Sequence, residues 1–223
     1  MIYSVALDGP GGAGKSTVAR RIAQKRGIVY VDTGAMYRVV ALYMTRLGVD
    51  VKDENAVKPH LSEVHISVKY EGGTQMMYLG DEDVSRAIRR PEISMAASDV
   101  SAHGSVRAFL LDTQRNMAKT QSVIMDGRDI GTVVLPDARV KVFLTADSHV
   151  RARRRLAELL AKGQDTDFET VLADIEKRDY QDIHRENAPL KQADDAVLLD
   201  TSGLTFEEVV DRMMTIIDEK TGE

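Results

Sequence analysis

Residues 9–16 read GPGGAGKS and match the phosphate-loop pattern G-x-x-x-x-G-K-[ST]. An apolar segment precedes this stretch and a helical pattern follows it, which is the context that the motif requires. Glycines let successive backbone N–H groups point at phosphate oxygens, and a lysine neutralises charge on the outer phosphates. A glycine-rich turn with a chance lysine is the less favoured alternative. The motif therefore predicts a site for the phosphates of a nucleotide, formed by Gly9, Gly11, Gly12, Ala13, Gly14, Lys15, Ser16 and Thr17.

A second feature is the aspartate that ends the apolar segment VIMD at 123–126. Such an aspartate is often only a turn former. Beside a phosphate loop, at the carboxyl edge of a parallel sheet, it can hold Mg²⁺ directly or through water. We therefore expect Asp126 and the Ser16 hydroxyl to be the metal-site residues.

Three further segments carry arginines: DTGAMYR (32–38), DGRDIGT (126–132) and RDYQDIHR (178–185). Phosphoryl transfer requires fixed positive donors and little acid–base chemistry. Arg128 and Asp129 belong to a loop that leaves the same sheet edge, although a surface salt bridge is the simpler explanation for them. The five histidines show no metal-ligand spacing, and no Ser/His/Asp set is evident.

The run RARRR at 151–155 allows three interpretations. A patch that binds nucleic acid is disfavoured by the formal net charge of −5. A solvated helix face and a lid that closes over ATP to exclude water are equally favoured. The lid interpretation predicts that at least one of the lid arginines Arg151, Arg153, Arg154 and Arg155 makes a donor-side contact.

These side chains must be positioned by an α/β framework. Apolar strand-like runs at 2–7 and 28–31 are each followed by a helical pattern that ends at a glycine, Gly27 or Gly48. This alternation predicts a parallel β-sheet core flanked by helices. It resumes with helical segments around 91–101 and 105–118, and with strands at 123–126, 140–145 and 196–200.

Two local patterns refine this framework. Alternating segments at 65–70 and 75–79, joined across Gly72 and Gly73, predict a small antiparallel insertion. Thr166 to Glu169 and Thr205 to Glu208 both match a capping box, which predicts that helices begin there.

Composition sets the remaining expectations. The 223 residues include 43% apolar residues, enough for one sizeable core, and the chain has no cysteine. No apolar stretch has the length of a membrane span. We expect a cytoplasmic protein that binds neither a membrane nor a nucleic-acid polymer.

Taken together, the segments DGPGGAGKST, DTGAMYR, DGRDIGTVV-x-PDA, RRR, RDYQDIHRENAPL and ADDAVLLDTS resemble the bacterial cytidylate kinases, within the nucleoside monophosphate kinases. The resemblance covers essentially the whole chain. It implies transfer of the γ-phosphoryl group of ATP to CMP or dCMP, with Mg²⁺ as cofactor and a monomeric enzyme.

The resemblance also implies residue roles by position. The catalytic set is Lys15, Arg38, Arg128 and Arg185, of which the three arginines grip the acceptor phosphate. Ser98, Arg107 and Asp129 read the cytosine, and Arg178 and Asp182 meet the sugar. Thr33 replaces a serine of other members in the CMP site. Ser94, Ser101 and Ser105 lie near Ser98 in the sequence and are the alternatives for that position.

The resemblance implies one kinase domain over 1–223. Its core spans about 1–34, 98–148 and 166–223, its acceptor-binding insertion about 35–97, and its lid about 149–165. Two other hypotheses stay open: an enzyme of the same class with UMP, dTMP or a small metabolite as acceptor, and a nucleotide-dependent switch. The switch is disfavoured because the chain lacks an Asn-Lys-x-Asp element.

Overall fold

The computed structural model describes residues 2–161 and 163–222 and divides into two compact units. Unit 1 comprises Met1–Ile28 and Ser122–Glu223, and unit 2 is the continuous segment Val29–Gln121. Positions 1, 162 and 223, of which 162 falls in the predicted lid, lie outside the described residues. Among the described residues, no helix combines the length and the apolar character needed to cross a bilayer.

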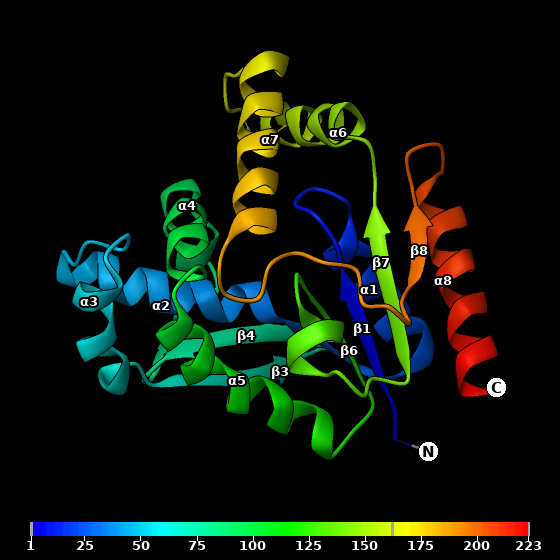
Figure 1. Cartoon of the computed structure of the whole chain (residues 1–223), viewed down its shortest axis with the longest axis horizontal. Coiled ribbons are helices and arrows are strands. Elements are labelled where there is room, and N and C mark those ends of the chain that lie inside the picture. The colour runs from blue at the N-terminus through cyan, green and yellow to red at the C-terminus, as the bar shows by residue number, and fades with distance from the viewer. Residues whose placement is uncertain (1, 162, 223) are drawn as a thin grey trace. The chain divides into compact units, whose positions relative to one another are not determined.

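Unit 1 contains a parallel sheet, as the apolar runs predicted. Its strands adopt the order β6-β1-β7-β8 (Figure 1). Most of their residues are buried, as is typical of parallel strands covered on both faces. The strands are β1 (Ser4–Asp8), β6 (Val123–Gly127), β7 (Val140–Thr145) and β8 (Val197–Asp200).

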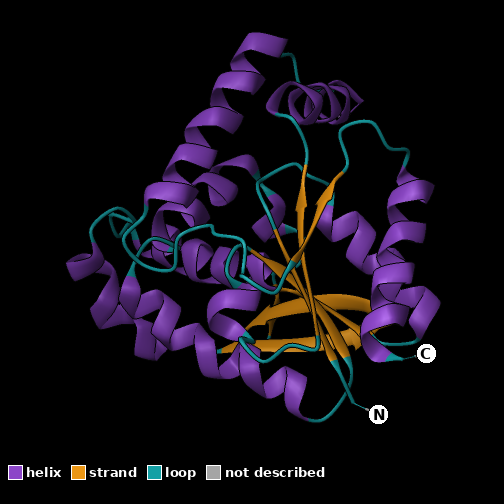
Figure 2. Cartoon of the chain, turned by 45° about the vertical axis from the view of Figure 1, so that its right-hand side comes forward, coloured by secondary structure: helices purple, strands orange, loops and turns teal. Residues whose placement is uncertain are grey.

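Four α-helices complete unit 1: α1 (Lys15–Arg26), α6 (Ser148–Ala161), α7 (Phe168–His184) and α8 (Phe206–Thr221). Helix α1 packs against β6 and α8, and α6 packs against α7. The carboxyl ends of the strands, drawn as arrowheads, point toward α6 and α7 in Figures 1 and 2. The sheet therefore presents the loops that follow its strands on the side of these two helices.

The helix starts show one confirmed and one wrong prediction. The capping box at Thr205 and Glu208 is present and begins α8. At α7 the cap is Asp167, whose side chain accepts a hydrogen bond from the Thr170 N–H, so the predicted cap at Thr166 is wrong by one residue. Aspartate is at least as good a cap as threonine, and here it lies closer to the first helical turn.

Unit 2 contains the predicted hairpin, β3 (Ile66–Glu71) with β4 (Thr74–Leu79), in antiparallel register. Gly72 and Gly73 both adopt positive φ, at 56° and 77°, which a two-residue turn of this kind requires. A short strand β5 (Glu82–Asp83) that the sequence analysis did not predict adds to this sheet. Its two exposed acidic residues show no alternating pattern.

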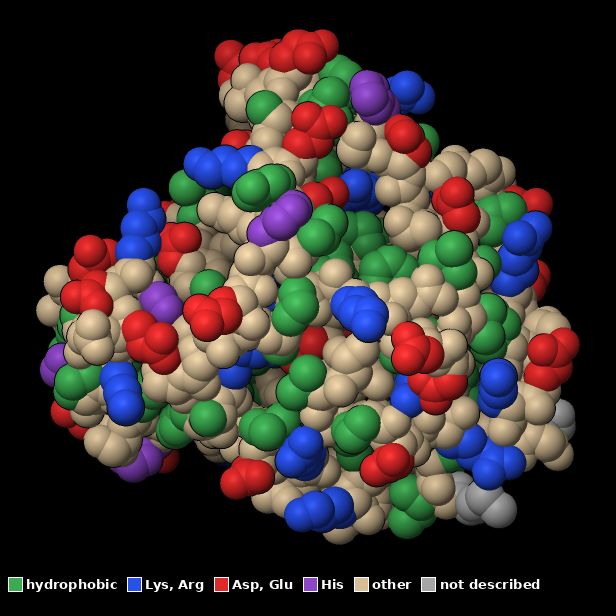
Figure 3. Space-filling model, viewed as in Figure 1, with side chains coloured by type: hydrophobic (Ala, Val, Ile, Leu, Met, Phe, Trp, Pro, Cys, Tyr) green, Lys and Arg blue, Asp and Glu red, His purple; other side chains and the backbone are tan. Residues whose placement is uncertain are grey.

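The rest of unit 2 is strand β2 and a set of helices, with α2 packed against α4 and α5. Their bounds are β2 (Val29–Asp32), α2 (Thr33–Leu47), α3 (Glu54–Val57), the 3₁₀ turns Lys58–Glu63 and Ala87–Arg89, α4 (Pro91–Val100) and α5 (Gly104–Lys119). Helices α4 and α5 match the predicted segments 91–101 and 105–118 to within one residue, and α2 ends before Gly48 as predicted, whereas α3 and the two 3₁₀ turns were not predicted. On the face shown in Figure 3, basic and acidic side chains are intermixed.

Candidate active site

The phosphate loop joins β1 to α1 and can be built only from glycine at one of its positions. Gly9 has φ of 146°, and a Cβ there would lie 1.9 Å from the carbonyl oxygen of Leu144 on β7. Gly12 and Gly14 also adopt positive φ, at 74° and 90°, and Gly14 caps α1. The loop therefore places backbone N–H groups at a helix N-terminus, the geometry that binds phosphate.

Lys15 is the buried cation of this loop. Its Nζ donates hydrogen bonds of 2.7 Å to the carbonyl oxygens of Gly9 and Pro10. Burial and the neighbouring Arg128 lower the pKa of Lys15 well below its ordinary value, while Asp126 and Asp182 act in the opposite direction. The ammonium group is thus held inside the loop that would receive the phosphates.

Ser16 and Asp126 form the pair predicted for a metal. The Ser16 hydroxyl donates to the Asp126 carboxylate at 2.7 Å, and Asp126 lies beside Leu7 in the sheet register. Mg²⁺ is usually held by one or two carboxylates together with substrate phosphates and water. This oxygen pair at the end of the phosphate loop fits such an ion. Among the described residues, no cluster of three or more acidic, histidine or cysteine side chains offers an alternative site.

Arginines and carboxylates from the loop after β6 and from the end of α7 form a buried cluster. Arg128 Nε lies 2.7 Å from Asp182, and Arg185 lies 3.7 Å from Asp182 and 3.8 Å from Asp129. Burial opposes ionisation of Asp182, but the attraction of Arg128 and Arg178 outweighs it and lowers the pKa of that carboxyl. The cluster therefore holds fixed positive charge at the sheet edge.

This cluster lies against the phosphate loop. A Cβ built on Gly11 would be 3.5 Å from Arg128 Nη2 and 3.7 Å from Arg178 Cδ. The structure thus brings together, within unit 1, the predicted phosphate-loop residues and Asp126, Arg128, Asp129, Arg178, Asp182 and Arg185.

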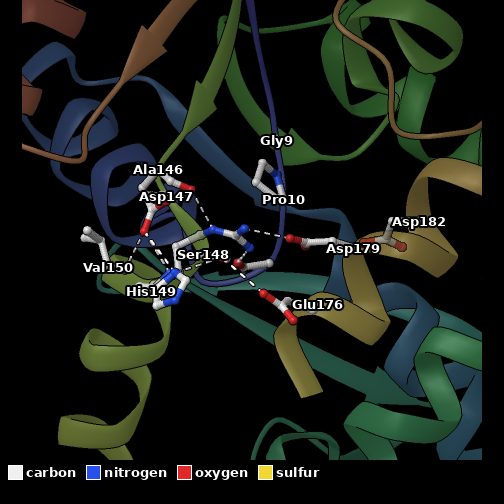
Figure 4. Close-up of polar contacts among 12 residues, drawn as sticks. Gly9, Pro10, Ala146, Asp147, Ser148, His149, Val150, Glu176, Asp179 and Asp182 are labelled. Atoms are coloured by element: carbon white, nitrogen blue, oxygen red, sulfur yellow. Dashed lines mark hydrogen bonds and ion pairs between the residues drawn. The ribbon is translucent and has the colours of Figure 1, made fainter. Parts of the chain in front are cut away.

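Of the four predicted lid arginines, Arg151 alone contacts the phosphate loop. Its buried guanidinium donates to the carbonyl oxygens of Ala146 (2.8 Å) and Gly11 (3.0 Å) and to the Asp179 carboxylate (2.6 Å). Figure 4 labels two of these acceptors, Ala146 and Asp179, together with the loop residues Gly9 and Pro10. Arg151 therefore connects the end of β7, the phosphate loop and α7.

The other three arginines of α6 point elsewhere. Arg154 donates to Thr201, to the carbonyl oxygen at 2.9 Å and to the hydroxyl at 3.3 Å. Arg155 is exposed and pairs with Glu158 on its own helix, and Arg153 is exposed.

The remaining predicted residues lie in unit 2. Thr33 is the first residue of α2 and Arg38 is on its next turn, while Ser98 is on α4. Arg107 on α5 donates to the Ser101 carbonyl oxygen at 3.1 Å, and its guanidinium lies 5.5 Å from the Tyr37 ring centroid. Within unit 2, Arg107 is thus next to the segment that contains Ser98.

Sequence reasoning missed several of the charged residues at these sites. Asp32 caps α2 by accepting from the Ala35 N–H at 2.9 Å, and it pairs with Arg89 at 2.8 Å. Burial opposes its ionisation, but Arg89 and Arg38 outweigh burial and lower the pKa of Asp32. An aspartate directly before a helix is a recognisable cap, so this position could have been found.

Asp8 and Asp179 were also missed. Asp179 is the partner of Arg151, and the Asp8 carboxylate accepts hydrogen bonds from the backbone of the loop after β6. Neither has a sequence pattern that would indicate its partners.

Comparisons with known proteins agree with this geometry. The sequence model of the family described as "Cytidylate kinase" matches residues 5–219. The cytidylate kinase of Lactobacillus johnsonii is 49% identical over 219 residues, which are 98% of this chain and 95% of that protein. The cytidylate kinase of Syntrophotalea carbinolica is 46% identical over 216 residues, 97% and 92% of the two chains.

A solved structure shows a similar fold. The crystal structure of an uncharacterized protein from Eubacterium ventriosum superposes with a TM-score of 0.55 at 14% sequence identity. The match covers 98% of this chain and 99% of that one. At this identity the likeness concerns the fold alone.

Proposed function

Because this chain belongs to the cytidylate kinase family, we propose that it transfers the γ-phosphoryl group of ATP to CMP or dCMP, giving ADP and CDP or dCDP. The observation that carries the proposal is the juxtaposition, at one sheet edge, of Lys15, the Ser16–Asp126 pair and the arginine cluster on Asp182. Phosphoryl transfer needs these parts: a phosphate loop, an oxygen pair for a metal, and fixed positive charge.

The donor side follows from the phosphate loop. Its N–H groups and the start of α1 would bind the ATP phosphates, and Lys15 would exchange its bonds to the Gly9 and Pro10 carbonyl oxygens for bonds to phosphate oxygens. Ser16 and Asp126 would hold Mg²⁺, which when bound neutralises charge on the phosphates. Nothing in this arrangement requires a further protein ligand, because phosphates and water complete the coordination of Mg²⁺.

The acceptor side in unit 1 is the arginine cluster. Arg128 and Arg185 would grip the phosphate of CMP, and Asp182 holds both guanidinium groups in place beforehand. Arg178 and Asp182 would meet the sugar, and Asp129 would read the base. For Thr33, Arg38, Ser98 and Arg107 of unit 2, the role in CMP binding is a proposal that rests on the family resemblance.

The reaction itself needs alignment and charge rather than a proton acceptor. A phosphate oxygen of the monophosphate, ionised near neutral pH, forms a bond to the γ-phosphorus as the bond to the β,γ-bridging oxygen breaks and ADP leaves. Lys15 and the arginines stabilise the charge on the transferred group. No histidine is required in this step.

Four further predictions remain proposals: the insertion, the lid, the monomeric state and the cytoplasmic location. The acceptor-binding insertion at 35–97 lies wholly within unit 2, and the lid at 149–165 coincides largely with α6. The monomeric state and the cytoplasmic location predicted from the sequence are supported by the family resemblance alone.

The decisive experiment is a panel of nucleoside monophosphates with Mg-ATP and detection of ADP. We expect kcat/KM to be highest for CMP and dCMP. The Lys15→Met variant, purified in parallel, reports any contaminating kinase, since removing this charge should abolish turnover while the protein stays folded. Faster turnover of UMP, dTMP or a small metabolite than of CMP would contradict the proposed acceptor.

A further inference from the structure

Asp8 is a buried carboxylate to which neither the phosphate-loop motif nor the family resemblance assigned a role. It is the last residue of β1 and immediately precedes the phosphate loop. Its Oδ1 accepts a hydrogen bond from the Ile130 N–H and its Oδ2 accepts one from the Gly131 N–H, each at 2.7 Å. One side chain of β1 thus holds two successive amides of the loop that follows β6.

The contact requires close approach of the loop to the carboxylate. A Cβ built on Gly131 would lie 3.3 Å from Asp8 Oδ2 and 3.2 Å from Lys141 Cδ. A larger residue at this position would crowd the Asp8 carboxylate and the Lys141 side chain, which would have to move by a few tenths of an ångström. This is a steric reason for glycine in the segment DGRDIGT.

The contact lies between the phosphate loop and the segment that carries Arg128 and Asp129. Ile130 directly follows Arg128 and Asp129, and it begins a π-helical turn, Ile130–Val134, in which the Asp129 carbonyl oxygen accepts from the Val133 N–H at 2.9 Å. On the other side, Asp8 is bonded covalently to Gly9, whose carbonyl oxygen accepts from Lys15. Asp8 therefore joins the donor loop to the segment that carries two acceptor residues.

Stability alone does not account for a carboxylate at this place. The group is 5% exposed, and burying an ionised carboxyl is costly even when it is hydrogen-bonded. Asp129, another buried carboxylate, repels it. A neutral asparagine would avoid this cost but has one acceptor oxygen where the carboxylate uses two, one for each amide.

We propose that Asp8 is a positioning residue, which uses its two backbone hydrogen bonds to fix Arg128 and Asp129 relative to Lys15 of the phosphate loop. The proposal rests on the proposed function, because it assigns the acceptor roles to Arg128 and Asp129. Asp8 does not touch the reacting atoms in this role and acts through the loop.

The test is the Asp8→Asn variant, which keeps the size of the side chain. Asparagine can accept from one amide through its oxygen, but its NH₂ group must then face the other N–H. We expect the KM for CMP to rise about tenfold, kcat to fall about tenfold, and the KM for ATP to change by less than about threefold. The ratio of kcat/KM for CMP over UMP should fall, since Asp129 is displaced.

A second readout does not depend on activity. Amide hydrogen exchange measured by NMR should accelerate about tenfold at Ile130 or Gly131 in the Asp8→Asn protein. The exchange test also keeps the two proposals distinguishable. If wild-type protein fails to phosphorylate CMP, the proposed function falls, while the exchange rates still decide whether Asp8 anchors the loop.

Two further variants complete the experiment. Val5→Ala removes a fully buried side chain from the same strand, so it controls for lost stability; it should lower Tm with little change in either KM. Gly131→Ala crowds the contact between the loop and the carboxylate while leaving Asp8 in place, and it serves if Asp8→Asn does not fold. Equal changes in both KM values, or unaltered exchange at Ile130 and Gly131 in a folded variant, would overturn the proposal.

Discussion

Several residues at this site have hydrogen-bond partners that are distant in the sequence. The type of such a residue does not by itself predict its contacts. Lys15, Ser16 and Asp126 were predicted because a motif or a strand end fixes their place. Asp8 was missed because a carboxylate at the end of a strand is commonly only a turn former, and its hydrogen-bond partner Ile130 lies 122 positions away. Chemistry that a local motif encodes can be predicted, whereas a contact made by folding cannot.

The base-reading role proposed for Asp129 leads to a prediction at this scale. Cytosine offers an amino donor where uracil has a carbonyl oxygen, so a buried carboxylate favours CMP. Asp129→Ala should reduce the ratio of kcat/KM for CMP over UMP by about tenfold or more. Arg185→Ala should lower kcat/KM for both monophosphates alike, because the phosphate is common to them. An unchanged ratio in folded Asp129→Ala protein would contradict the role.

Asp8 also makes stability depend on pH. Burial, aided by Asp129, raises its pKa to about 6, although hydrogen bonds from Gly131 and Ile130 and the charge of Lys15 oppose this. The folded protein therefore holds the proton more tightly than the unfolded chain, whose carboxyl titrates near 3.8. Stability from this group is complete below the unfolded pKa and is lost as pH rises through about 6.

The free energy of unfolding of wild type minus that of Asp8→Asn should thus fall as pH rises from 4 to 7, by up to about 3 kcal/mol. Urea denaturation of both proteins at several pH values measures it. Since other titrating groups are common to both proteins, their contributions cancel in the difference. A difference that is constant with pH, or that grows with pH, would show that Asp8 is not buried as described.

At the scale of secondary-structure elements, apolar periodicity predicted most strands and the long helices. It did not predict the short strand β5 or which arginine of α6 is buried. The helix α1 buries Val18, Ala19, Ile22 and Ala23, the face that its spacing predicted. Strand β5 could not be predicted, because its pairing with β4 involves backbone groups and two exposed acidic side chains. Nor could the run RARRR indicate which arginine turns inward, since that depends on where α7 packs.

The arginines of helix α6 differ in burial and in hydrogen bonding. We therefore expect their substitutions to differ in their effects on activity and stability. Arg151→Ala removes bonds to three elements, including the hydrogen-bonded ion pair with Asp179, so it should lower kcat/KM for ATP at least about tenfold and destabilise by about 3 kcal/mol. Arg155→Ala, the matched control on the same helix, loses only an exposed pair worth less than about 1 kcal/mol.

Steady-state kinetics and thermal unfolding of the two variants test this prediction. Arg153→Ala, another exposed position, should behave like Arg155→Ala. If Arg155→Ala loses activity while Arg151→Ala retains it, the helix presents its exposed face to ATP, and the contact of Arg151 with Gly11 is dispensable.

The whole molecule consists of a discontinuous unit and a continuous one, and the sequence indicated this only in part. The interruption of the α/β alternation at 65–79 showed that something is inserted. Unit 2 includes β2 and α5 as well as the hairpin, because α2 packs against both β4 and α5, and β2 packs against β4. Such packing depends on which helix and strand surfaces meet in the folded protein, and hydrophobic periodicity along the chain does not predict it.

A prediction for the whole molecule concerns the response of unit 2 to acceptor. Monophosphate kinases close around their acceptor, so CMP should slow hydrogen exchange or proteolysis in or beside the hairpin at 65–79. Exchange measured by mass spectrometry with CMP, with UMP and with no nucleotide gives the comparison. Equal protection by CMP and UMP at saturation would point to phosphate binding alone, and no change with CMP would contradict the expected closure.

The parallel pairing of β1 has a consequence for synthesis on the ribosome. Its neighbours in the sheet are β6 and β7, with Ser4 opposite Val123 and Val5 opposite Val140. Because β1 and the phosphate loop precede both partners along the chain, they are synthesised before them, and β1 stays unpaired until residues 123–127 and 140–143 have emerged. Unit 2, being continuous, can fold in that interval. A chaperone that shields residues 2–8 of the nascent chain would act during the same interval.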